Sequence, residues 1–252
     1  MNEFFGFSLD LGALAISVAL IAAYYFFLNL KVKEDPTYTI HGVNALARTL
    51  WVKNVMRNPG KDVMAVQTLR NFIMGASLMA STAALLIVGT LTLSGQSDNI
   101  SHSWHALNAM GSNATELWIF KVMCLLADFI VAFFAFAMSV RLANHVVFMV
   151  NVPEHDAHHN LTPKAVAQRL HRAGNMFAIG MRSFFFAVPL VFWLFGPYFL
   201  LVSAIGLVAA LYHLDRSEPA SDTEKPAISP VNSPVIPMQA KQSNRPSLQA
   251  QQ

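Results

Sequence analysis

A carboxylate and an ammonium group, those of Asp128 and Lys121, lie inside a long apolar stretch of the chain. Asp128 is near the middle of that stretch, where an ionised carboxylate in lipid costs at least about 2.5 kcal/mol. Ala132, Ala135 and Ser139 follow at helical spacing, so Asp128 shares a face with small residues that suit contact with other helices. Lys121 is on the same face, about 10 Å away along the axis, too far for a direct ion pair.

This pattern supports two hypotheses about Asp128 and Lys121. In the first, they form a polar site at the membrane midplane that takes up a proton or a cation. In the second, Asp128 is protonated and hydrogen-bonds to a neighbouring helix. Both hypotheses place the face of Asp128 in the protein interior.

A second group of polar side chains lies where the apolar stretches end on one side. Arginine forks match the geometry of phosphate and carboxylate, so such a group can bind an anionic headgroup or solute. The alternative is a structural network whose arginines extend to the lipid headgroups. The group consists of Asn29, Gln67, Arg70, Asn71, Arg141, Asn144, His145 and Arg182.

His155, His158 and His159, with Asp156 between them, are the weak candidates for metal ligands. Their spacing is not that of the helical zinc motif, in which two histidines lie four residues apart around a glutamate. A solvated loop rich in histidine is the alternative, and we predict no metal and no cofactor. The chain also offers no nucleophile–base pair, so the sequence identifies no catalytic residue and leans away from an enzyme.

Four apolar stretches must position these groups, at residues 9–30, 72–93, 117–140 and 184–211. Each exceeds the roughly 20 residues that a helix needs to cross the hydrocarbon core of a bilayer. In the fourth, Pro189 and Pro197 could kink one helix or support a re-entrant pair. The chain is 54% hydrophobic and only 12% charged. The sequence therefore predicts an all-α integral membrane protein built as a four-helix bundle.

Basic residues are distributed unevenly among the connectors. Residues 31–71 contain seven Lys and Arg, whereas residues 94–116 contain none. By the positive-inside rule, the first connector is cytoplasmic in a multi-pass protein of the plasma (inner) membrane. Four crossings then place both the N-terminus and the C-terminus on the non-cytoplasmic side. The basic residues suit anionic lipid headgroups, and no nucleic-acid partner is expected.

Two amphipathic helices are expected on the cytoplasmic side, at residues 38–57 and 163–182. In the first, Val43, Leu46 and Leu50 recur at helical spacing as an apolar stripe. In the second, Thr162 is suited to be the N-cap and Pro163 the first helical residue. We interpret both helices as lying along the inner leaflet.

The chain divides into a membrane domain, residues 1–215, and a tail, residues 216–252. The tail is rich in Pro, Ser, Gln and Asn and holds almost no aromatic residue. Such a composition buries too little apolar surface to offset the entropy of ordering, so we predict a disordered tail.

Several separated motifs resemble one family of multi-pass membrane proteins, the domain of unknown function 599 (DUF599) family. The motifs are GVNALARTLWV at 42–52, AVQTLRNFIM at 65–74, VRLANHVVFMVNVP at 140–153 and PLVFWLFGP at 189–197. The resemblance extends from Leu9 to Asp215. It implies a multi-pass membrane fold and brings no established activity or catalytic residue.

Two functions remain open. The first is a small transporter or channel-like protein, with Asp128 as its midplane polar group. The second is a membrane scaffold or assembly partner that organises lipids or other proteins. Ladders of small residues at spacing four, such as Ala76, Ala80 and Ala84, indicate close helix packing and allow a homo-oligomer.

Overall fold

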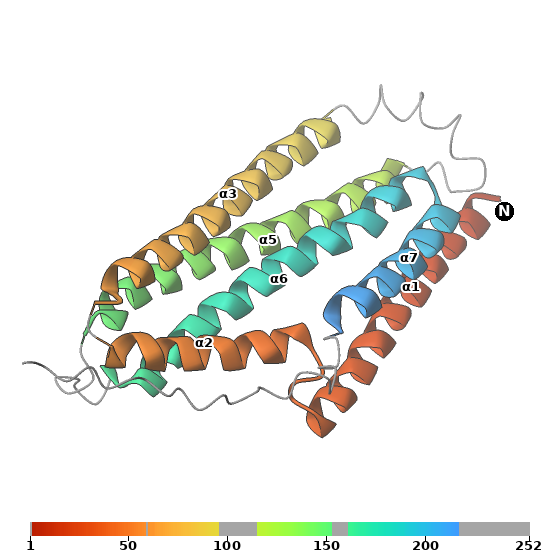
Figure 1. Ribbon diagram of the computed structural model, residues 1–252. Coiled ribbons are helices and arrows are strands. Elements are labelled where there is room, and N and C mark those ends of the chain that lie inside the picture. Colours follow the sequence, from red (N-terminus) through yellow and green to blue (C-terminus); the bar gives the residue numbers. More distant parts are fainter. Residues whose placement is uncertain (1, 59, 96–114, 153–160, 217–252) are drawn as a thin grey trace, which may run out of the picture. The chain divides into compact units, whose positions relative to one another are not determined.

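The computed structural model describes residues 2–58, 60–95, 115–152 and 161–216, and within them it is all helical (Figure 1). Five of the six helices are long and apolar enough to cross a membrane, and the exception is α2. The helices are α1 (Asn2–Glu34), α2 (Ile40–Arg57), α3 (Asp62–Gly95), α5 (Thr115–Val150), α6 (Pro163–Phe195) and α7 (Pro197–Asp215).

Residues 184–211 do not form one kinked helix, because this stretch is divided between α6 and α7, as the alternative of a helix pair predicts. Gly196 separates the two helices with φ +145° and ψ 165°, a conformation open essentially to glycine alone. Pro197 then starts α7 at a position where proline needs no hydrogen-bond partner for its nitrogen. Pro189, in contrast, lies inside α6 without ending it.

The separate helix predicted over residues 163–182 is wrong. Its start is confirmed, since the Thr162 hydroxyl accepts a hydrogen bond from the backbone N–H of Ala165 and Pro163 opens the helix. The helix then continues to Phe195 as α6, with no break. The sequence contains no helix-ending signal near residue 182, and the change from amphipathic to apolar composition does not by itself end a helix.

α5 lies between α3 and α6, while α7 packs on α6 and α1 packs on α7 (Figure 1). Small residues and one buried hydrogen bond bring α5 and α6 together. The Ser139 hydroxyl donates to the Ala173 carbonyl at 2.8 Å. Gly180 lies so close to the Phe136 ring that a Cβ there would be 2.7 Å from it. Because lipid removes the hydrophobic drive for helix association, this close packing is what holds the helices together.

α2 packs across the end of the bundle at which α3 begins, α5 ends and α6 begins. Its buried residues Val52, Val55 and Met56 form one apolar cluster with residues of all three helices. The Thr39 hydroxyl caps α2 by accepting a hydrogen bond from the Gly42 N–H. Val43, Leu46 and Leu50 of the predicted stripe are exposed on the other side of α2, and their placement along the inner leaflet stays a prediction. The structure turns another residue of α2, Arg48, inward.

The five long helices alternate in direction, so α7 ends at the end of the bundle opposite to the start of α1 (Figure 1). The prediction that both termini lie on the non-cytoplasmic side assumed four crossings. Five long apolar helices favour opposite sides instead, and the position of the C-terminus stays a prediction because it lies outside the described residues. The predicted tail, apart from Arg216, lies outside the described residues. The predicted spans 9–30, 72–93 and 117–140 fall within α1, α3 and α5.

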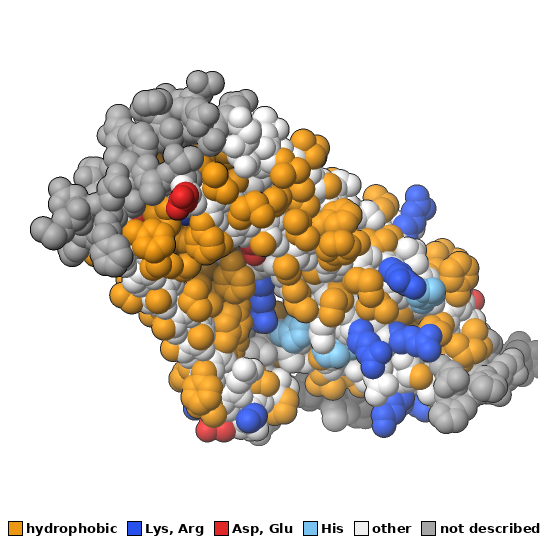
Figure 2. Space-filling model, turned by 180° about the vertical axis from the view of Figure 1, so that it is seen from behind, with side chains coloured by type: hydrophobic (Ala, Val, Ile, Leu, Met, Phe, Trp, Pro, Cys, Tyr) orange, Lys and Arg blue, Asp and Glu red, His pale blue; other side chains and the backbone are white. Residues whose placement is uncertain are grey.

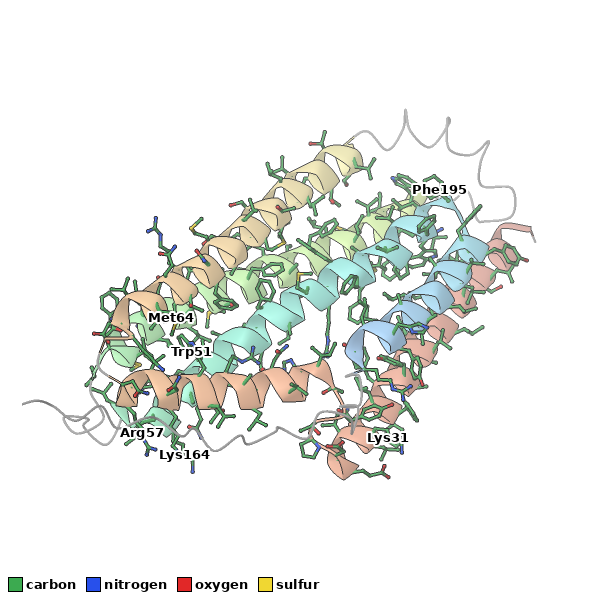
Figure 3. The ribbon with its side chains drawn as sticks, viewed as in Figure 1. Lys31, Trp51, Arg57, Met64, Lys164 and Phe195 are labelled. Atoms are coloured by element: carbon green, nitrogen blue, oxygen red, sulfur yellow. The ribbon has the colours of Figure 1, made fainter. Side chains whose placement is uncertain are left out.

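The two ends of the bundle differ in charge. Arg57 and Lys164 lie near α2, at the end opposite to Phe195, which closes α6 (Figure 3). Seen from behind, the Lys and Arg side chains gather over one part of the surface and hydrophobic side chains cover most of the rest (Figure 2). We call the end that carries α2 the basic end, and the end that carries Gly196 the opposite end.

Candidate functional site

A buried ion pair joins α1 to α5 near the opposite end. Lys121 Nζ lies 2.8 Å from Asp10 Oδ1, and their side chains are 3% and 0% exposed. The indole N–H of Trp193 on α6 donates to the same oxygen at 2.9 Å. Lys121 Nζ also lies 5.3 Å from the centroid of the Trp193 ring. We call Asp10, Lys121 and Trp193 the charged triad.

The triad solves an electrostatic problem in the apolar interior. A charge within membrane-spanning helices is costly unless it is paired or hydrogen-bonded. Here the carboxylate receives both an ammonium group and an indole N–H, and the indole ring faces the cation. Removing one partner of such a pair leaves an uncompensated buried charge.

Asp10 is a functional candidate that the sequence reasoning missed. It lies inside the first apolar stretch, at its second residue, and thus satisfied the same rule that singled out Asp128. Asp10 was not chosen as a candidate because it lies near the end of the stretch, where charged residues are common. The structure shows that Lys121 pairs with Asp10.

Asp128 lies two helical turns further along α5, half-buried. The Ser183 hydroxyl of α6 hydrogen-bonds to its carboxyl group. Its Oδ2 is buried and has no hydrogen-bond partner in the described part of the chain. Asp128 and Lys121 thus have different partners, and the proton- or cation-binding role of Asp128 stays a prediction.

A second polar contact joins α1, α6 and α7 at the basic end. The Tyr24 hydroxyl donates to Asp215 Oδ2 at 3.0 Å, which links α1 to the end of α7. Arg182 of α6 extends to Asp215 Oδ1 at 4.0 Å, and its guanidinium carbon lies 5.2 Å from the centroid of the Tyr25 ring. We call Tyr24, Tyr25, Arg182 and Asp215 the basic-end contact.

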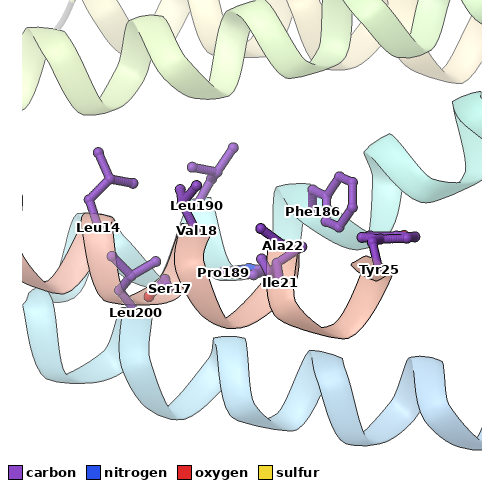
Figure 4. Close-up of a pocket in the computed structure, with 10 residues that line it drawn as sticks. All are labelled: Leu14, Ser17, Val18, Ile21, Ala22, Tyr25, Phe186, Pro189, Leu190 and Leu200. Atoms are coloured by element: carbon purple, nitrogen blue, oxygen red, sulfur yellow. The ribbon is translucent and has the colours of Figure 1, made fainter. Parts of the chain in front are cut away.

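An apolar cavity of about 390 Å³ lies along α1 between these two contacts. Its walls come from α1, α6 and α7, with Leu14, Ile21 and Phe186 among them (Figure 4). Ser17 also lines it, and the buried Ser17 Oγ has no hydrogen-bond partner among the described residues. We call this space the α1 cavity.

Most of the predicted group at the ends of the stretches does not form a buried site. Arg182 is partly buried in the basic-end contact. The other members are exposed on α1, α3 and α5, and they are Asn29, Gln67, Arg70, Asn71, Arg141, Asn144 and His145. A role for these seven in binding headgroups stays a prediction.

The weak metal candidates His155, His158 and His159 lie outside the described residues. Within the described ranges, no three His, Cys, Asp or Glu side chains are grouped so that they could hold a metal ion. The single cysteine, Cys124, is a partly buried thiol that packs near Trp193.

Comparison with known proteins gives one match. A family model described as "Protein of unknown function, DUF599" matches residues 12–220, most of the chain. No curated protein matches the chain, and no solved structure does.

Proposed function

We propose that this chain, which belongs to the DUF599 family, is a small membrane transporter whose α1–α7 pair moves against α3, α5 and α6. One observation carries the proposal. The α1–α7 pair is joined to α5 and α6 by polar contacts at each end of α1, and the α1 cavity lies between them.

This arrangement suits alternating access. Ion pairs and hydrogen bonds can break and form again, whereas packed apolar side chains have few alternative arrangements. Opening the charged triad would expose the α1 cavity to the opposite side of the membrane. Opening the basic-end contact would expose it to the basic side.

The α1 cavity also indicates the class of substrate. Its walls are apolar except for the hydroxyls of Ser17 and Tyr25. A largely apolar solute with one or two hydrogen-bonding groups fits this chemistry, because Ser17 Oγ and the Tyr25 hydroxyl are both buried without a partner among the described residues. Asp128 supplies a separate carboxyl group that can couple the movement to a proton.

Cysteine labelling tests the proposal without knowledge of the substrate. Cys124 is first replaced by alanine, and Ser17→Cys is then introduced into that background. A membrane-impermeant maleimide is added to vesicles of either orientation. We expect little labelling until one contact is removed.

Asp10→Asn should raise labelling only from the opposite side, and Arg182→Gln only from the basic side. Glu116→Gln and Arg141→Gln are the matched controls, because both side chains are exposed near the respective ends. Equal labelling from both sides in every variant would contradict alternating access. So would an unchanged rate in both Asp10→Asn and Arg182→Gln.

A scaffold or assembly role is the second candidate, and the surface of α3 favours it. Met74, Leu78, Leu85, Val88 and Leu91 of α3 are exposed. A partner helix that covers them would co-purify with the protein in mild detergent. Purification as a monomer without a partner, with a stability that added lipid does not change, would count against this role.

A further inference from the structure

Arg48 is partly buried against α6, and no carboxylate among the described residues pairs with it. Its guanidinium lies directly over Gly174, where an added Cβ would collide with Nη1 and lie 2.7 Å from Cζ. Nε and Nη2 are buried and have no hydrogen-bond partner in the described part of the chain. Glycine at position 174 thus allows this close approach. In this position, two nitrogen donors of the Arg48 guanidinium have no acceptor among the described residues.

Other cationic or ionisable groups surround this guanidinium. The rings of His41 on α2 and His171 on α6 lie 5.9 Å apart. His171 Nε2 is 3.3 Å from Asn175 Nδ2, while its Nδ1 is buried without a partner. Burial, followed by the charges of Arg182 and Arg48, holds the pKa of His41 below its usual value.

The charge around Arg48 is therefore positive, and no described residue compensates it. Arg48 keeps its charge at neutral pH, although burial lowers its pKa. Unpaired buried donors on a charged group cost more than those on a neutral one. An anion bound at the guanidinium would remove that cost.

The surroundings of Arg48 suit the binding of a lipid better than the binding of a small soluble anion. A cavity of about 340 Å³ opens beside Arg48 between α2, α3 and α6. Its remaining walls are mainly apolar and include Trp51, Leu69, Phe72 and Leu170. Such apolar walls suit an acyl chain. With the chain in this cavity, the phosphate of the same lipid would lie at the guanidinium of Arg48.

The outer surface of α2 agrees with this placement. The exposed apolar residues Val43, Leu46 and Leu50 give α2 a surface that can enter the boundary between headgroups and acyl chains. On the side of α2 that meets the start of α6, a second cavity of about 550 Å³ is lined by Lys164, His171 and Arg172, among others. Positive charge thus surrounds the contact between α2 and α6.

We propose that Arg48 binds the phosphate of an anionic phospholipid, with one acyl chain in the cavity lined by Trp51, Leu69, Phe72 and Leu170. His41 and His171 strengthen the positive field. Gly174 has no side chain and therefore leaves room for the guanidinium. This site is separate from the α1 cavity. Lipid binding at Arg48 does not depend on the proposed transport function.

The test measures binding and thermal unfolding of the purified full chain in neutral detergent. Phosphatidylglycerol, phosphatidylcholine and inorganic phosphate are added in separate titrations. We expect phosphatidylglycerol to bind most tightly and to raise the unfolding temperature. Arg48→Gln should weaken its binding by roughly tenfold or more, since a charge-assisted hydrogen-bonding fork is lost.

Lys53→Gln is the matched control, because Lys53 is exposed on the same helix, α2, and the same charge is removed. Arg48→Lys keeps the charge but not the fork, and an intermediate affinity would support the geometry. If Arg48→Gln fails to fold, Arg48→Lys and Gly174→Ala provide the comparison, and the proposal expects both to bind phosphatidylglycerol more weakly.

Three outcomes would overturn the proposal. The first is equal loss of binding in Lys53→Gln and Arg48→Gln, which would mean that net charge alone attracts the lipid. The second is equal binding of phosphatidylcholine and phosphatidylglycerol. The third is full stabilisation by inorganic phosphate, which would assign the site to a free anion.

Discussion

Asp10 and Lys121 are neutralised by each other in an interior where either charge alone would be costly. The partner of each lies on a different helix, so the pair also holds α1 against α5. Trp193 adds α6 to the same contact. A single polar contact thus connects three of the five long helices.

We predict that Asp10→Asn lowers the free energy of unfolding by about 3–5 kcal/mol, because Lys121 would remain buried without its counter-ion. Chemical unfolding in detergent micelles measures this change. The double variant Asp10→Asn/Lys121→Met should recover much of the loss, because no charge then remains buried. A double variant as unstable as the sum of the two single ones would show that the pair has no coupling energy.

His41 gives a second prediction, on pH. Its pKa in the folded protein lies below the ordinary value of 6.5, chiefly because of burial and then the charges of Arg182, Arg48 and His171. Below that pH the unfolded chain binds more protons than the folded one, so stability falls as the pH falls. The fall in unfolding temperature from about pH 7.5 to about pH 5.5 should be smaller in His41→Gln than in the unchanged protein.

His145→Gln is the control for this experiment, because His145 is exposed on α5. It should retain the full pH dependence of the unchanged protein. An equal pH dependence in His41→Gln would mean that His41 does not contribute.

At the level of helices, close backbone approach organises the bundle. Gly180 of α6 faces the Phe136 ring of α5, and Gly75 of α3 has no neighbour near the place of a Cβ. Both glycines lie inside helices, yet only one is needed for packing. They form a natural pair for comparison.

We expect Gly180→Ala to destabilise the protein by about 1–3 kcal/mol, because the methyl group would overlap the Phe136 ring. Gly75→Ala should instead stabilise it by up to about 1 kcal/mol through helix propensity. Unfolding temperatures of the two variants in the same detergent provide the measurement. A similar change in both would remove the packing argument for Gly180.

For the molecule as a whole, the five long apolar helices and the charge asymmetry together predict an orientation in the membrane. The end of α7 lies at the basic end, and the positive-inside rule places that end in the cytoplasm. We therefore predict that a fluorescent reporter fused after Gln252 is cytoplasmic. A reporter inserted within residues 96–114 should be on the other side of the membrane.

Enzymatic and fluorescent reporters that are active on only one side make this measurement. A non-cytoplasmic reporter after Gln252 would mean that α7 does not cross the membrane. In that case the sequence prediction of four crossings would be restored.

Much of the fold could be predicted from the sequence. Long apolar stretches indicated helices in a membrane, and Thr162 with Pro163 marked the start of α6. The number of long helices stayed open, because Pro189 and Pro197 could either kink one helix or support a pair. The structure shows that the helix continues through Pro189 and that the break lies at Gly196, whose positive φ is visible only in the structure.

The sequence by itself determined that the chain is helical and apolar, and which connectors carry positive charge. The tertiary structure decided which polar groups pair, namely Asp10 with Lys121 and Arg182 with Asp215. It also decided that the guanidinium of Arg48 lies against Gly174. The physical reason is that helices apolar on all sides carry no pattern that fixes which face turns inward. Their rotation is set by close packing and by the pairing of a few polar groups, and these depend on several helices at once.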